Sequence, residues 1–403
     1  MVKSLIVLSF LLISHTFNVF SAEIRPDEIL AYRSVNGRSL NLHVFYPDGM
    51  KAGKDRTAVI HFFGGGWMGG TPRQFYEQCE YLSSIGIVAI SAEYRLMKDD
   101  GITPFDCVED AKKAISYVRE NSGYLGISAY KIVASGGSAG GHLALCTAVF
   151  SDDENLSSVP NALVLYNPVL DTSDKGYGKN KFSGNELSLS PNHNLKKGLP
   201  PVLILHGTQD HTVPFANAHD FDAKMKQLKN DCSFIPVWGM DHGFFNGSYF
   251  RKSNGDAMFR FCMSKVLSFL NDLSFLPSDV RLTECKIPVF YVLRNSDKKE
   301  VALLQKMLGD NYHVTEWNIS DKEKYIKHIP TVLVAELDKD TENTLAKFVS
   351  EQTVKPSVFF YDKKNDKAKM SGIKVYPIKK IKECDSLHIT EHIYDEILNN
   401  LLK

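Results

Sequence analysis

The segment Ser135–His142, SGGSAGGH, places Ser138 among four glycines and follows the apolar run Lys131–Ala134. This pattern predicts a buried strand that turns abruptly into a helix, with Ser138 at the tip of the turn. Side chains at Gly136 and Gly140 would collide with the adjacent strand and helix, so glycine leaves the room that the turn needs. A chain with such a unit is expected to expose the serine hydroxyl at one edge of a sheet.

From residue 27 to about 277, short apolar runs alternate with amphipathic segments. This alternation predicts an α/β fold with a mostly parallel central sheet and helices on both faces. Strands are expected around residue 33 and at 40–46, 58–63, 87–91, 131–134, 162–166, 202–205 and 232–237. Helices are expected at 72–84, 104–120, after residue 138, at 214–228 and at 256–273.

Residues 167–200 are rich in Gly, Ser, Asn and Lys and show no clear period. A segment of this length inside a compact domain is usually functional, so we interpret it as a lid or substrate-facing excursion. We assign residues 23–277 to this first α/β domain. A second alternating run follows, and residues 283–403 are predicted to form a smaller C-terminal α/β domain of unknown role.

In that second run, strands are expected at 288–293, 314–318, 331–335 and 357–361. Helices are expected at 299–308, at 342–349 and toward residue 402. The run contains no phosphate-binding glycine loop, metal cluster or second nucleophile motif in its sequence.

The N-terminus indicates export. Lys3 precedes an apolar run at 5–13, and the segment closes on Ser21 and Ala22. This predicts a signal peptide over residues 1–22 and a secreted or periplasmic protein, with a retained anchor as the alternative. Later segments are too polar to span a bilayer, so stable membrane insertion is not expected. Lys and Arg number 47 against 47 Asp and Glu, and this balance disfavours a nucleic-acid partner.

The seven cysteines form an odd number and show no CxxC spacing for zinc or redox chemistry. No metal site is therefore expected. Cys79 and Cys107 lie in polar surroundings at the edges of predicted helices and are the candidates for a disulfide bridge. Unpaired thiols are the alternative.

A serine hydroxyl is a poor nucleophile unless a base accepts its proton and a carboxylate orients that base. In hydrolases with the G-x-S-x-G turn, the chain order is serine, acid, histidine. Asp210 follows a predicted strand, and His242 lies in the loop before the last helix of the domain. We therefore predict the triad Ser138, Asp210 and His242. A glycine-rich turn capped by a serine is the alternative for Ser138.

Other residues compete for these roles. His206 belongs to a packing turn, His211 neighbours the acid but points elsewhere, and His142 lies inside the helix after the serine. Among acids, Asp241 is too close in sequence to bond the His242 ring, and Asp171 precedes the excursion.

The segment Phe62–Trp67, FFGGGW, follows a predicted strand and exposes consecutive glycine amides. Such a loop supplies donors for the oxyanion of an acyl-transfer reaction. We predict an oxyanion hole formed by Gly64 and Gly65 together with Ala139, whose amide begins the helix after the serine. A flexible glycine loop without a role is the alternative.

These segments resemble the exported α/β-hydrolases related to feruloyl and acetyl-xylan esterases, which neighbour the hormone-sensitive-lipase group. The resemblance covers about residues 25–275 and rests on FFGGGWMGGTPRQF, AEYRL, TPFDCVEDAKKAISYVREN, ASGGSAGGHLA, LPPVLILHGTQDHTVPF and GMDHGFFN. It implies the α/β-hydrolase fold with Ser138, Asp210 and His242 in the triad positions, and with Gly64, Gly65 and Ala139 in the oxyanion positions.

The chain departs from that family at two places. Phe63 stands where the family's HGGG loop has histidine, with His61 two residues earlier, and Glu93-Tyr94-Arg95 replaces D-Y-R.

The expected activity is serine-dependent hydrolysis of short acyl or aromatic esters without a metal or organic cofactor. The resemblance implies a small-molecule or polysaccharide ester as substrate. Trp67, Phe244 and Phe245 are candidates for an apolar acyl pocket, with ordinary core packing as the alternative.

A lipase, a serine peptidase of the same fold and a binding protein without turnover are the other functions considered. The polar residues 167–200 disfavour the lipase, and the short segment before the sheet disfavours the peptidase. The intact set Ser138, Asp210 and His242 disfavours the binding protein.

Overall fold

The computed structural model describes residues 23–283 except 49–54, 100, 152–155, 238–239 and 251–254, then five further strands and residues 302, 305 and 306. The predicted signal peptide, residues 1–22, lies outside the described residues. Among the helices of the described part, none has both the length and the apolar character that crossing a bilayer requires.

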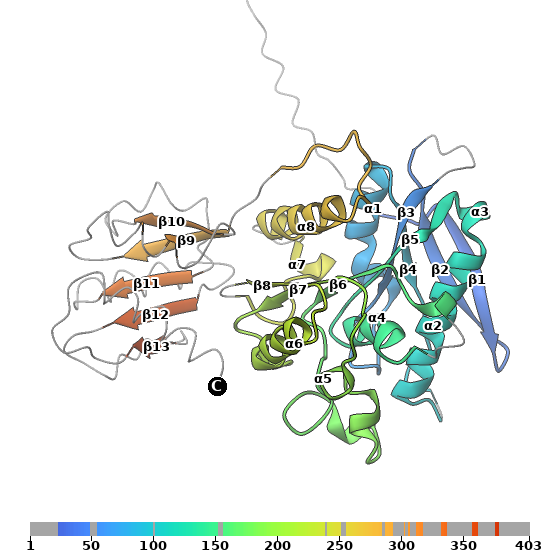
Figure 1. Ribbon diagram of the computed structural model, residues 1–403, viewed down its shortest axis with the longest axis horizontal. Coiled ribbons are helices and arrows are strands. Elements are labelled where there is room, and N and C mark those ends of the chain that lie inside the picture. The colour runs from blue at the N-terminus through green and yellow to red at the C-terminus, as the bar shows by residue number, and fades with distance from the viewer. Residues whose placement is uncertain are drawn as a thin grey trace, which may run out of the picture.

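Eight strands form the main sheet in the order β1-β2-β4-β3-β5-β6-β7-β8 (Figure 1). They are β1 (Glu28–Val35), β2 (Arg38–Phe45), β3 (Arg56–Phe62), β4 (Val88–Ala92), β5 (Ile127–Gly137), β6 (Ala162–Tyr166), β7 (Val202–Gly207) and β8 (Cys232–Val237). β2 pairs antiparallel with β1 and β4, and every other neighbouring pair is parallel. The carboxyl ends of β3, β5, β7 and β8 therefore meet at one edge, and the mostly parallel sheet expected from the sequence is confirmed.

Helices cover both faces of this sheet. On one face lie α1 (Tyr76–Ser84) and α8 (Gly255–Asp272), and on the other lie α2 (Pro104–Glu120), α4 (Ala139–Val149) and α6 (Phe215–Gln227) (Figure 1). Tyr81 and Phe259 join α1 to α8 through an edge-to-face contact with ring centroids 5.5 Å apart. Shorter helical elements are η1 (Pro72–Phe75), α3 (Ser122–Leu125), η2 (Leu156–Ser158) and α7 (Gly247–Phe250).

The predicted excursion, residues 167–200, contains η3 (Lys179–Lys181), η4 (Glu186–Leu189) and α5 (Pro191–Asn194). Its apolar side chains Phe182 and Leu189 are buried. Asn192 joins it to α6 through a 3.0 Å hydrogen bond from Nδ2 to the carbonyl of Asn217. The excursion therefore packs onto the domain as part of its structure.

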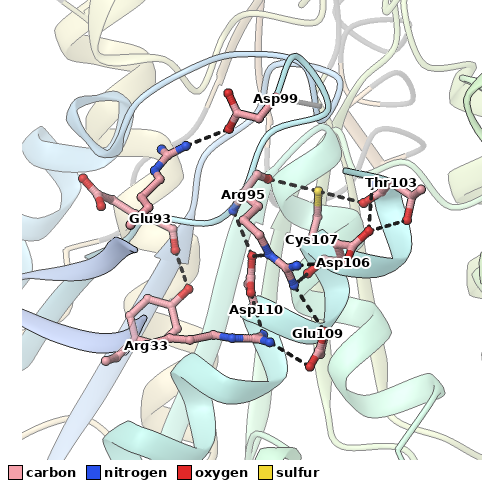
Figure 2. Close-up of polar contacts among 11 residues, drawn as sticks. Arg33, Glu93, Arg95, Asp99, Thr103, Asp106, Cys107, Glu109 and Asp110 are labelled. Atoms are coloured by element: carbon pink, nitrogen blue, oxygen red, sulfur yellow. Dashed lines mark hydrogen bonds and ion pairs between the residues drawn. The ribbon is translucent and has the colours of Figure 1, made fainter. Parts of the chain in front are cut away.

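The loop that follows β4 is fastened onto α2 by a network of charges (Figure 2). The backbone amide and Nε of Arg95 donate to Oδ2 of Asp110 at 2.9 and 2.8 Å, and Nη1 of Arg33 donates to its Oδ1 at 2.6 Å. Asp110 is fully buried. Because burying a carboxylate is costly unless it is paired, this network fixes the position of the loop.

The predicted bridge between Cys79 and Cys107 is wrong. Both cysteines are free and buried, one in α1 and the other in α2. The thiol of Cys107 donates to the carbonyl of Arg95 at 3.1 Å. The polar residues that suggested a surface bridge lie on other faces of the two helices, whereas the cysteines face the interior.

A second sheet is formed by β9 (Ile287–Val292), β10 (Tyr312–Glu316), β11 (Val332–Glu336), β12 (Ser357–Tyr361) and β13 (Val375–Ile378). Its order is β10-β9-β11-β12-β13, and every pair is parallel. The sequence predicted the first four strands but not β13. Apart from residues 302, 305 and 306, the helices predicted in this part lie outside the described residues, and the division into domains stays a prediction.

Candidate active site

Ser138 occupies a sharp turn between β5 and α4, with φ 56° and ψ −124°. A Cβ on Gly136 would lie 2.5 Å from the carbonyl of Gly140, and one on Gly140 would overlap the carbonyl of Phe62. Both positions therefore require glycine for steric reasons, as the sequence predicted. A positive φ at a serine costs on the order of 1–3 kcal/mol and is found mainly at functional sites.

Asp210 lies in the turn after β7 and contacts His242 from the loop after β8. Oδ2 of Asp210 lies 2.7 Å from Nδ1 of His242. Oδ1 accepts the backbone amides of Thr212 and Val213, each at 2.8 Å. Because an ionised carboxylate only accepts hydrogen bonds, Nδ1 of His242 carries a proton and Nε2 is left as an acceptor.

A second imidazole faces the same carboxylate. Nε2 of His206 lies 3.3 Å from Oδ2 of Asp210 and 3.1 Å from the carbonyl of Val213. Burial alone would raise the pKa of Asp210, but its contacts with His206 and His242 outweigh burial and hold that pKa well below the usual range. The sequence pattern around His206 predicts a packing turn, but its position four residues before the predicted acid is a signal for this contact.

Asn167 joins the two loops that carry Asp210 and His242. Its Nδ2 donates to the carbonyl of His242 at 2.6 Å, and its Oδ1 accepts the amide of Gly207 at 2.7 Å. Asn167 directly follows β6 and has φ 42°, a backbone conformation that asparagine tolerates. Sequence reasoning missed this residue because it placed Asn167 at the start of the excursion.

The ring of Phe245 contacts both the serine turn and His242. A Cβ on Gly137, the residue before Ser138, would overlap this ring. The ring also meets the imidazole of His242 edge-on, with centroids 6.1 Å apart. The turn that carries Ser138 and the imidazole of His242 therefore lie beside the same aromatic ring, at the edge of the sheet where Asp210 also lies.

The glycine loop after β3 lies against the serine turn, since a Cβ on Gly64 would be 3.0 Å from Cβ of Ser138. The amide of Gly64, however, donates to Oε1 of Gln74 at 2.6 Å. That amide is already used, so Gly64 does not fit its predicted role as an oxyanion donor. Within the described residues, the amides of Gly65 and Ala139 have no protein acceptor, and these two remain as the predicted donors.

The three aromatic residues predicted to line an acyl pocket are buried: Trp67 is 0% exposed, and Phe244 and Phe245 are each 1% exposed. Trp67 packs edge-on against His142 and Phe182. This burial agrees with the core-packing alternative, and the acyl-pocket role stays a prediction.

The competing acids and bases have other partners. Oδ1 of Asp241 accepts the backbone amides of His211 and His242 at 3.3 and 2.7 Å. Nε2 of His142 lies 2.7 Å from the carbonyl of Leu189, and burial lowers the pKa of His142 to about 4. Asp171 accepts an amide within the excursion.

His61, the nearest histidine to the position of the HGGG imidazole, does not brace the glycine loop. Its ring stacks on Phe75 with centroids 4.8 Å apart, and neither ring nitrogen has a partner among the described residues. Burial lowers the pKa of His61 to about 3, so the ring is neutral at physiological pH. The described residues also contain no group of three or more His, Cys, Asp or Glu side chains placed to hold a metal ion.

Comparison with known proteins shows similarity to esterases. The family model BD-FAE matches residues 42–185. An acetylxylan esterase of Xylanibacter ruminicola is 26% identical over 211 residues, which are 48% of this chain and 42% of that protein. The chain thus spans about half the length or less of the curated relatives it matches first.

Among solved structures, esterase 2 of Thermogutta terrifontis is 38% identical and has a TM-score of 0.59. The match covers 64% of this chain and 99% of that esterase. Esterase LipQ of Mycobacterium tuberculosis is 26% identical over 214 residues, which are 47% of this chain and 50% of that protein.

Proposed function

This chain belongs to the α/β-hydrolase esterases. We propose that it hydrolyses carboxylic esters with Ser138 as nucleophile and His242 as general base. Asp210 is the carboxylate that orients His242. The observation that carries this proposal is the 2.7 Å contact between Asp210 and His242 at the sheet edge where the strained turn presents Ser138.

Acylation begins when Nε2 of His242 accepts the hydroxyl proton of Ser138 while Oγ attacks the ester carbonyl carbon. The carbonyl oxygen becomes an oxyanion, which accepts hydrogen bonds from the amides of Ala139 and Gly65. Each such donor typically contributes about 3 kcal/mol to transition-state stabilisation. The tetrahedral species then collapses, and the C–O bond to the alcohol breaks. The departing alcohol takes the proton from Nε2, and the acyl group stays on Ser138.

Deacylation uses the same groups in reverse order. A water molecule gives its proton to Nε2 of His242 and attacks the acyl carbon, and a second oxyanion forms. When this species collapses, Oγ of Ser138 leaves and takes the proton back, which releases the carboxylic acid. Asp210 stays ionised throughout, because its hydrogen bonds hold its pKa low, and it stabilises the imidazolium form of His242.

The substrates that we propose are short acyl or aromatic esters, with carbohydrate esters among them. The BD-FAE match and the acetylxylan esterase relative support this choice. Structures of the T. terrifontis esterase are described as bound to propionate and to butyrate, which are short carboxylates. The apolar run near the N-terminus supports export, which would bring the enzyme to extracellular polysaccharide.

A substrate panel tests the proposal. We would assay the wild type and Ser138→Ala on p-nitrophenyl acetate, butyrate and octanoate, methyl ferulate, acetylated xylan and a peptide amide. The proposal expects hydrolysis of the short or aromatic esters by the wild type and none above background by Ser138→Ala. Activity on octanoate alone would indicate a lipase, and activity on the amide a peptidase. No turnover of any substrate would indicate a binding protein.

A further inference from the structure

Hydrogen bonds hold the first peptide of the glycine loop, residues 63–68, at both its carbonyl and its amide. At its start, the carbonyl of Phe63 accepts the hydroxyl of Tyr94 at 2.7 Å. The amide of the same peptide, on Gly64, donates to Oε1 of Gln74 at 2.6 Å. The peptide that joins Phe63 to Gly64 is therefore fixed at both its polar atoms.

The peptides that follow Gly65 are fixed as well. The carbonyl of Gly65 accepts the amides of Met68 and Gly69 at 3.1 and 3.2 Å. The carbonyl of Gly66 accepts Nζ of Lys181 at 2.9 Å. The next carbonyl, of Trp67, accepts the amide of Met97 at 2.8 Å.

Between these fixed peptides lies the one that joins Gly64 to Gly65. In residues 63–68, all of which the structure describes, it is the peptide with neither an acceptor for its N–H nor a donor for its carbonyl. Gly65 has φ 138°, a region open to glycine alone, so its own backbone does not limit where this amide points. The direction of the Gly65 amide must therefore be set by the hydrogen bonds of the neighbouring peptides.

Two of those bonds come from side chains on different elements. Gln74 lies in η1, and Lys181 lies in η3 within the excursion. The ammonium of Lys181 lies 5.8 Å from the centroid of the Trp67 ring and 5.5 Å from that of Tyr177. A Cβ on Gly66 would lie 2.7 Å from the hydroxyl of Tyr177, so the excursion contacts the glycine loop directly.

We propose that Gln74 and Lys181 are positioning residues. Gln74 holds the peptide before the Gly64–Gly65 peptide and Lys181 holds the Gly66–Trp67 peptide beyond it, so that together they aim the Gly65 amide at the oxyanion before substrate binds. This inference rests on the proposed esterase function. It gives the excursion a catalytic role other than covering the substrate, because the excursion supplies Lys181. A donor that is fixed in advance needs no reorganisation during the reaction, which makes its hydrogen bond to the oxyanion more effective.

The test uses the full-length protein and the substrate p-nitrophenyl butyrate. We would compare Gln74→Met, Lys181→Met, the double variant and Lys181→Arg with the wild type. Lys179→Met is the matched control, because Lys179 lies in the same short helix η3 and is exposed. The readouts are kcat, KM and the inhibition constant of a trifluoromethyl ketone, which forms an oxyanion on the serine.

We expect each single variant to lower kcat roughly 10- to 100-fold, the loss typical of a misplaced catalytic group, with KM changed by less than about 2-fold. The inhibition constant should rise by a similar factor. Because both side chains act on the direction of one amide, that of Gly65, the double variant should lose less than the product of the two single losses. Lys181→Arg should recover much of kcat, and Lys179→Met should match the wild type.

The proposal is overturned if both single variants keep the wild-type kcat, if the loss lies in KM alone, or if Lys179→Met loses as much as Lys181→Met. The two substitutions lie on separate elements, so either one decides the question if the other fails to fold. A wild-type protein that hydrolyses no ester would instead contradict the proposed function.

Discussion

Asp210 and His242 differ in exposure although they are in contact: the Asp210 side chain is 0% exposed, whereas that of His242 is 20% exposed. The 2.7 Å contact between them leaves Nε2 of His242 on the side away from the carboxylate. A buried acid thus orients an imidazole that the solvent and a substrate can reach.

This relationship predicts a large effect of Asp210→Asn. The amide keeps the shape of the side chain but no longer requires the proton to reside on Nδ1 of His242. We expect kcat on p-nitrophenyl butyrate to fall by about 10⁴, the loss seen when a triad carboxylate is replaced by its amide, with little change in KM. Asp241→Asn is the control, since among the described residues Asp241 accepts the backbone amides of His211 and His242, and it should lose less than about 10-fold. Equal losses in the two variants would contradict the assignment of the acid.

The low pKa of Asp210 also predicts how stability depends on pH. A carboxyl group whose pKa is lower in the folded than in the unfolded protein stabilises the fold above its unfolded pKa of about 4, and this contribution is lost as pH falls further. We expect the melting temperature of the wild type to exceed that of Asp210→Asn at pH 6, and the gap to shrink between pH 4 and pH 3. Circular dichroism melts at several pH values measure this gap, and a gap that stays constant would refute the linkage.

The burial of Cys79 and Cys107 predicts that their thiols do not react in the native protein. Burial raises the pKa of the Cys79 and Cys107 thiols, so neither forms the reactive thiolate near neutral pH. We expect no labelling of these two residues by iodoacetamide in the native protein and full labelling in urea. Peptide mass spectrometry before and after reduction reads both results. A peptide pair linked through these residues would show that the bridge forms after all.

The network around Asp110 predicts a large loss of stability in Asp110→Ala. This substitution leaves the buried backbone amide and Nε of Arg95 without their acceptor, while Arg33 and Arg95 keep Glu109 as a partner, and an unsatisfied buried donor typically costs about 1–3 kcal/mol. The exposed pair of Arg38 and Asp99 gives the control, because Asp99→Ala should cost less than about 1 kcal/mol. Urea unfolding followed by near-UV circular dichroism measures both values, and similar losses would contradict the importance of the buried network.

The order of elements could be predicted because each local signal agreed with the tertiary structure. The alternation of apolar and amphipathic segments yielded the parallel sheet, and α2 begins and ends at the predicted residues. Its start is marked by Thr103, whose backbone amide and hydroxyl donate to the carboxylate of Asp106 at 2.9 and 2.7 Å. Gly136 and Gly140 could likewise be interpreted from the sequence, because a Cβ at either position would clash with the backbone around the turn.

What the sequence could not supply were contacts between distant side chains. Consecutive glycine amides look equivalent in sequence, and only the side chain of Gln74 distinguishes Gly64 from Gly65. His206 and Asn167 acquire their roles from loops that meet at the sheet edge. The helical positions of Cys79 and Cys107 set which way their thiols face, and this determines that they stay free.

The most direct test of the central claim is to identify the residue that an organophosphate modifies. The T. terrifontis relative is described as phosphorylated by paraoxon. We predict that paraoxon adds one diethylphosphoryl group to the peptide that contains Ser138, and that ester hydrolysis falls in proportion to this labelling. Ser138→Ala should remain unlabelled and His242→Ala should be labelled far more slowly. Labelling at another residue, or unchanged hydrolysis by Ser138→Ala, would contradict the account.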